Sequence, residues 1–137
     1  MTKVFKQGRI LTAFIVALCL MTVMAVTAFA DSRTQLLTPV NGGVYSGPLT
    51  AIVWSKTSDV KASQINITAL DGSFVYNSGP IYMTPGSSGY YVHNLPYSVY
   101  STMPTGKAYS VYVEDYHYSG DTYTGFSSDQ AFFSIIP

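Results

Sequence analysis

The chain has 137 residues, with seven basic and seven acidic side chains, so its formal net charge is zero. Cys19 is the only cysteine, which excludes a disulfide within the chain. No basic stripe runs along the sequence, which argues against binding to nucleic acid or to anionic lipid.

The first thirty residues predict a signal peptide. Basic residues within 1–9 precede an uncharged apolar run that ends in Ala28-Phe29-Ala30, the small-x-small pattern at which signal peptidase cuts. The run is also nearly long enough to span a bilayer, which takes about 20 residues, so an uncleaved N-terminal anchor is the alternative. In both cases we expect residues 31–137 to be exported, either secreted into the extracellular space or held at the cell surface.

Residues 31–137 are expected to form one domain that is stabilised by its hydrophobic core alone. This part of the chain contains no cysteine, although a disulfide would be permitted in an oxidising compartment. It keeps four basic residues against seven acidic ones, a net charge of −3. A domain of this length buries roughly two-thirds of the surface of its unfolded chain.

Short apolar runs separated by frequent turn signals predict an all-β sandwich or barrel. The turn signals recur every eight to twelve residues, which is typical of these folds. In chain order they are PVNGG, KTSD, LDGS, NSGP, TPGSSG, MPTGK and YSGD. No stretch of residues 31–137 has a convincing helical period.

Alternation along the runs indicates which side chains face the core, because successive residues of a strand point to opposite faces. In QINITAL the two isoleucines share a face, and in YSVYVE the first tyrosine and the two valines do. LTAIVWS and QAFFSII are apolar on both faces, which suggests central strands or a covering segment. The predicted core residues are Ile52, Trp54, Ile65, Ile67, Tyr109, Val111 and Val113.

Two stretches resemble fibronectin type III and bacterial Ig-like domains. LLTPVNGGVYSGPLTAIVWS is similar to their opening strands, and MPTGKAYSVYVED is similar to the turn and strand that carry their corner tyrosine. The resemblance implies one antiparallel β-sandwich of about seven strands over residues 31–137. It implies that Trp54 is the buried tryptophan of the second strand, and that the hydroxyl of Tyr109 bonds to backbone just upstream.

One segment departs from this pattern. HNLPYSVYSTMPTGKAY is longer than the usual connection into the strand of the corner tyrosine. The fifth strand either ends near Leu95 or continues through Val99. The placement of residues 84–102 therefore stays open.

The remaining tyrosines have two interpretations, as a packing surface or as a contact surface. Tyr112, Tyr116 and Tyr118 have the outward parity of their strand, and Tyr123 follows across a turn. Exposed tyrosines can pair across strands and stabilise a sheet. They also provide rigid, amphipathic contact area, and in this fold their hairpin would lie beside the connection 55–63. We take these four tyrosines as the candidate binding residues.

No catalytic, metal-binding or cofactor-binding motif stands out. His117 lies two residues from Asp115 on the same face, but His93 is the only other imidazole, and too few ligands are at hand for a metal. A serine, a histidine and an aspartate can be combined into a triad on paper, but serines are too abundant for this to be informative. We therefore expect a protein that is not an enzyme and that binds no cofactor or metal.

The leading hypothesis is a small secreted binding domain that docks on cell-envelope polysaccharide or on a surface protein through tyrosine-rich loops. The alternative is a self-assembling structural subunit of an extracellular matrix or appendage. That alternative rests on the charge-poor composition and on the apolar terminal strand 131–136, since edge strands can pair with another chain.

Overall fold

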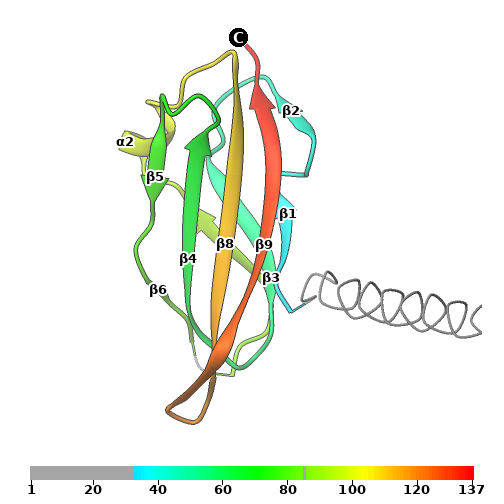
Figure 1. The fold of residues 1–137 in the computed structure, drawn as a ribbon, viewed down its shortest axis with the longest axis vertical. Coiled ribbons are helices and arrows are strands. Elements are labelled where there is room, and N and C mark those ends of the chain that lie inside the picture. The colour runs from blue at the N-terminus through cyan, green and yellow to red at the C-terminus, as the bar shows by residue number, and fades with distance from the viewer. Residues whose placement is uncertain (1–32, 85) are drawn as a thin grey trace, which may run out of the picture. The chain divides into compact units, whose positions relative to one another are not determined.

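A computed structural model describes residues 33–84 and 86–137 (Figure 1). They belong to one compact unit, Asp31–Pro137, which contains a hydrophobic core of its own. The predicted signal peptide, residues 1–30, and its anchor alternative lie outside the described residues and stay predictions. Among the described residues, no helix is both long enough and apolar enough to cross a membrane.

The predicted all-β sandwich is confirmed. Short runs rich in Val, Ile and Tyr form the strands, and Gly- and Pro-containing turns separate them. Within the described ranges the elements are β1 (Gln35–Thr38), β2 (Gly43–Tyr45), β3 (Ala51–Lys56), β4 (Val60–Ala69), β5 (Val75–Asn77), β6 (Ile81–Tyr82), β7 (Gly89–Asn94), α2 (Tyr97–Tyr100), β8 (Lys107–Ser119) and β9 (Thr122–Ile135).

The strands form two sheets that pack face to face. The small sheet has the order β1-β3-β7, and the large sheet has the order β2-β9-β8-β4-β5, with β6 also paired to β4. Every pair is antiparallel except β2 with β9. In Figure 1 the long β8–β9 hairpin extends past the other strands, at the end of the domain opposite the C-terminus.

The core lies between the two sheets. All seven residues expected there are fully buried, at 0% exposure. Phe133 of β9 lies parallel to Tyr109 of β8, with 5.2 Å between the ring centroids. The other buried apolar residues are Leu49, Val60, Ala69, Met83, Leu95, Met103, Ala131 and Ile135.

Tyr109 makes the contact that the resemblance implies. Its hydroxyl donates a hydrogen bond to the backbone oxygen of Pro104, 2.5 Å away and five residues upstream. The ring is buried while the hydroxyl reaches the connection that precedes β8. This bond therefore fastens that connection to the core.

Replacing Tyr109 with phenylalanine is expected to lower the free energy of unfolding by about 1 kcal/mol, because the ring stays and one hydrogen bond is lost. Urea denaturation of residues 31–137 measures the change. Tyr97→Phe is the control, since the Tyr97 side chain is exposed on α2. Equal stability of the wild type and of Tyr109→Phe would show that the hydroxyl contributes nothing.

The open question about residues 84–102 is resolved in favour of the shorter strand. β7 ends at Asn94, and α2 follows after Pro96. Leu95 is buried, and its N–H donates to the backbone oxygen of Thr50 at 2.8 Å. Pro96 has no N–H to donate, so the ladder with β3 cannot continue past it.

Part of the C-terminal strand, β9, is not a free edge of its sheet. Residues 133–135 of β9 pair with β8 on one side and with β2 on the other. Gly43 permits the tight turn that leads into β2, because a Cβ there would lie 2.8 Å from the backbone oxygen of Val40. The expectation of an open apolar edge over residues 131–136 is therefore wrong for its C-terminal part, since a short parallel strand covers it.

Candidate functional site

The aromatic side chains gather on the outer face of the large sheet and not in a loop. Tyr112, Tyr116 and Tyr118 point outward from β8, with the parity that the sequence predicts. However, β8 continues to Ser119 and the turn has only two residues, Gly120 and Asp121. The expected tyrosine-rich loop is thus mostly strand, because a glycine with φ of 59° allows a tight hairpin turn.

Part of this aromatic face was not predicted from the sequence. Phe126 of β9 lies directly opposite Tyr116 and is exposed, and Phe132 is exposed further along the same strand. The sequence could have revealed these phenylalanines, because both have outward parity once β8 and β9 are paired as a hairpin. The aromatic face therefore consists of Tyr112, Tyr116, Tyr118, Tyr123, Phe126 and Phe132.

Three of the predicted tyrosines are held by neighbours within this face. The Tyr116 hydroxyl donates to the Glu114 carboxylate at 2.7 Å, and this bond raises the pKa of Tyr116 to about 12. The rings of Tyr118 and Tyr123 meet edge to face, with centroids 5.6 Å apart. These contacts fix the ring orientations in advance of any ligand, which lowers the entropy cost of binding.

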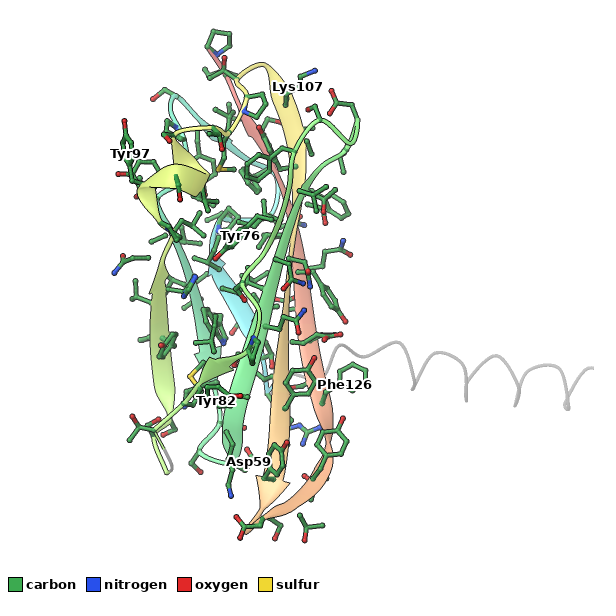
Figure 2. The ribbon with its side chains drawn as sticks, turned by 90° about the vertical axis from the view of Figure 1, so that its left-hand side faces the viewer. Asp59, Tyr76, Tyr82, Tyr97, Lys107 and Phe126 are labelled. Carbon is green, nitrogen blue, oxygen red and sulfur yellow. The ribbon has the colours of Figure 1, made fainter. Side chains whose placement is uncertain are left out.

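An open hollow of about 370 Å³ lies beside Tyr118, near the hairpin turn. Tyr82 of β6 forms another wall and is 80% exposed, and Figure 2 shows it at this end of the domain. The lining residues are Lys61, Ala62, Tyr82, Met83, Tyr118 and Asp121.

The hollow also carries a charged pair. The Lys61 Nζ lies 3.0 Å from Asp121 Oδ1 and 5.5 Å from the centroid of the Tyr118 ring. Lys61 lowers the pKa of Asp121 below its usual range through a hydrogen bond. Both partners are accessible to solvent, so they contribute little to stability and are available to bind hydroxyl groups of a ligand.

The connection between β3 and β4 lies beside this end of β8, as expected. The Tyr118 N–H donates to the backbone oxygen of Asp59 at 2.9 Å. Figure 2 shows Asp59 and Tyr82 at the same end of the domain, with Tyr97 at the other. The hollow is thus supported by a rigid connection as well as by the hairpin.

The inward face of β8 becomes polar toward the hairpin turn. Asp115 follows Val111 and Val113 on that face and is 0% exposed. Its Oδ2 accepts from Thr34 Oγ1 at 2.6 Å, and its Oδ1 accepts from Trp54 Nε1 at 3.1 Å and from Ser63 Oγ. Three donors thus compensate the burial of one carboxylate.

His117, the next inward residue of β8, is also 0% exposed. Its Nδ1 lies 2.9 Å from Asp59 Oδ2, and its Nε2 lies 2.5 Å from Ser127 Oγ. This is the order of contacts in a Ser-His-Asp triad. Ser127 is only 2% exposed, however, and its Oγ is also 2.5 Å from Thr34 Oγ1, so a substrate has no access to the hydroxyl in this arrangement.

The two histidines do not come together as metal ligands. His93 lies on β7, where its Nε2 is 3.3 Å from the Tyr76 hydroxyl, and burial lowers its pKa. Among residues 33–84 and 86–137, no group of three or more His, Cys, Asp or Glu side chains is placed to hold a metal ion.

Comparison of this chain with protein-family models, with curated proteins and with solved structures gives no match. The function of this protein must therefore be inferred from its fold and from the contacts described above.

Proposed function

We propose that this protein is a non-catalytic binding domain that docks on cell-envelope polysaccharide through the hollow between Tyr82 and Tyr118. The observation that carries the proposal is the combination of two accessible tyrosine rings with the Lys61–Asp121 pair in one open depression. We expect the domain to act outside the cell, as the predicted signal peptide implies.

The chemistry of the hollow suits a sugar ring. A pyranose has apolar C–H faces that pack on aromatic rings, and its hydroxyls need donors and acceptors at the rim. Lys61 offers donors and Asp121 offers acceptors at that rim. The hollow is open and not enclosed, which fits a segment of a long polymer better than a small molecule buried on all sides.

The strand order supports the finer assignment of the fold. The sheets β1-β3-β7 and β2-β9-β8-β4-β5, the buried Trp54 and the Tyr109 corner bond all agree with an Ig-like domain of the fibronectin type III kind. Domains of this architecture present binding surfaces on a rigid scaffold. This assignment concerns the fold and leaves the ligand to be identified from the site itself.

Removing both rings from the hollow is expected to weaken binding about tenfold or more, because each aromatic contact contributes roughly 0.5–1.5 kcal/mol beyond its area. The test is co-sedimentation of residues 31–137 with cell envelopes, comparing the wild type with the double variant Tyr82→Ala/Tyr118→Ala. The double variant is expected to stay folded, because neither ring belongs to the core.

Tyr97→Ala is the matched control, since Tyr97 is 73% exposed and lies at the other end of the domain (Figure 2). Equal pelleting of the wild type and of the double variant would contradict the proposal. Treating the envelopes with protease in one arm and with periodate in another distinguishes the two partners: loss of binding after protease alone indicates a surface protein.

One observation favours self-association as a second candidate function. Among the strands of residues 33–84 and 86–137, β7 is paired only to β3, so none of them covers its other edge. Its sequence GYYVHN contains no proline and no Lys, Arg, Asp or Glu. Tyr90 and Val92 of this strand are exposed. A free edge without such protective residues can add a strand from a second copy. Light scattering that shows a monomer at high concentration for residues 31–137 would exclude this candidate.

A further inference from the structure

We propose that the hollow is one end of a longer binding surface, which lies across the strands of the large sheet and takes an extended, uncharged polysaccharide. This surface follows four side chains on neighbouring strands, which we call the cross-strand row: Tyr82 of β6, Ala62 of β4, Tyr116 of β8 and Phe126 of β9. The inference rests on the proposed function and adds the direction, the reach and the charge of the ligand.

The register of the sheet places the members of the row side by side. Ala62 pairs with Tyr82 on one side and with Tyr116 on the other. Tyr116 in turn pairs with Phe126. Neighbouring strands lie about 4.8 Å apart, so the three steps from β6 to β9 span roughly 14 Å. Figure 2 shows Tyr82 and Phe126 at nearly the same level along the strands.

The rings of the row belong to the outer face of the sheet. Tyr116 lies between two buried residues of β8 and therefore points away from the core. Tyr82 is 80% exposed and Phe126 is 53% exposed, and neither belongs to the hydrophobic core. Exposed apolar side chains that are scattered singly are ordinary, whereas rings gathered beside a hollow indicate a contact surface.

Ala62 leaves space between the rings. Its side chain is a single methyl group that lines the hollow together with Tyr82. A sugar ring placed on Ala62 therefore has Tyr82 on one side and Tyr116 on the other, and the following sugars of the chain reach Phe126. Successive aromatic rings suit the apolar C–H faces of successive pyranoses.

Neutral hydrogen-bonding groups follow the row on one side. Two residues away along each strand, Gln64 and Ser128 lie on either side of Glu114. The next residues with the same outward parity are Asn66, Tyr112 and Gln130, which pair across the same three strands. Amides and hydroxyls both donate and accept hydrogen bonds, as the hydroxyl groups of a sugar require.

The charges around the row favour an uncharged ligand. None of its four residues is charged, and the Glu114 carboxylate beside it already accepts from the Tyr116 hydroxyl. Lys61 and Asp121 are paired with each other at the hollow. The excess of acidic over basic residues in 31–137 repels an anionic polysaccharide. A cationic polysaccharide would need carboxylates along the row, and the row contains none.

Two phenylalanines of β9 provide a matched test. Phe126→Ala removes the last ring of the row. Phe132→Ala removes the same side chain with the same outward parity and a similar exposure, 47%, but roughly 20 Å further along the strand. The probes are disaccharide and hexasaccharide fragments, obtained by partial acid hydrolysis of protease-treated envelopes. Titration calorimetry with residues 31–137 measures their affinities.

We expect Phe126→Ala to weaken hexasaccharide binding about three- to tenfold, the usual effect of losing one aromatic contact. The disaccharide is too short to reach from Tyr82 to Phe126, so its affinity is expected to change less than about twofold. Phe132→Ala should change neither affinity. Phe126→Tyr keeps a ring and should bind like the wild type, which separates a contact from a general effect on folding.

The double variant Tyr82→Ala/Tyr118→Ala separates this inference from the proposed function. If the double variant loses both fragments while Phe126→Ala equals the wild type, the hollow binds alone and the cross-strand row is wrong. Equal losses for Phe126→Ala and Phe132→Ala would also overturn the row. If the double variant binds like the wild type, or if the wild type binds neither fragment, the proposed function fails and this inference fails with it.

Salt dependence tests the charge of the ligand. Because an uncharged chain has no ion pairs to be screened, we expect the hexasaccharide affinity to change less than about twofold between about 0.05 M and about 0.5 M sodium chloride. A steep fall of affinity with salt would show that the chain is charged and would overturn this assignment.

Discussion

Replacing Asp115 with alanine is expected to lower the free energy of unfolding by about 3–5 kcal/mol, the range for breaking a buried charged contact. The carboxylate is fully buried and accepts hydrogen bonds from Thr34, Trp54 and Ser63. Its removal leaves these donors without an acceptor, in a part of the core that water does not reach. Since a domain of this size is stable by only about 5–15 kcal/mol, this loss is a large part of the total stability.

Urea denaturation, followed by near-ultraviolet circular dichroism, measures the loss. Asp129→Ala is the matched control, because Asp129 has the same inward parity on β9 but is only partly buried, and it accepts the N–H groups of Leu36 and Gln130. We expect it to cost about 1 kcal/mol. If the two variants lose equal stability, the buried hydrogen bonds to Asp115 stabilise the domain no more than the contacts of Asp129 do.

Replacing Trp54 with alanine is expected to cost a similar amount, about 3–5 kcal/mol, mainly through the cavity that it leaves. Trp54 is at the centre of the small sheet, is 0% exposed, and packs on Tyr91 with 5.0 Å between ring centroids. Trp54→Phe helps to separate the two roles of the indole, since it keeps much of the ring volume but removes the donor to Asp115.

We expect Trp54→Phe to fall between the wild type and Trp54→Ala in denaturation midpoint. If Trp54→Phe is as unstable as Trp54→Ala, the hydrogen bond to Asp115 outweighs the packing. If instead Trp54→Ala loses less than about 1 kcal/mol, Trp54 is not a core residue in solution.

The sheet architecture was predictable because it depends on local pattern. Alternation in QINITAL and YSVYVE placed the apolar residues of β4 and β8 on one face, and the turn signals separated the strands. The same alternation extended to Asp115 and His117 would have placed both in the interior. Their polarity argued against it, because charged residues are seldom buried without partners.

The partners themselves could not be predicted from one sequence. Thr34 meets Asp115 across 81 residues and Ser127 across 93, and nothing local distinguishes these side chains from the many other serines and threonines. The hollow could not be predicted for a similar reason, since Tyr82 comes near Tyr118 only because β6 and β8 both pair with β4. The length of the β8–β9 hairpin was missed because the turn needs two residues only.

The position of the C-terminus has a practical consequence for experiments on binding. Pro137 follows β9 at the end of the domain opposite the hairpin turn (Figure 1). A tag or a surface linkage added after Pro137 therefore leaves Tyr82 and Tyr118 directed toward solution. Immobilised in this orientation, the domain can serve as an array reagent for screening polysaccharides, and coupling through Lys61 would block the same surface.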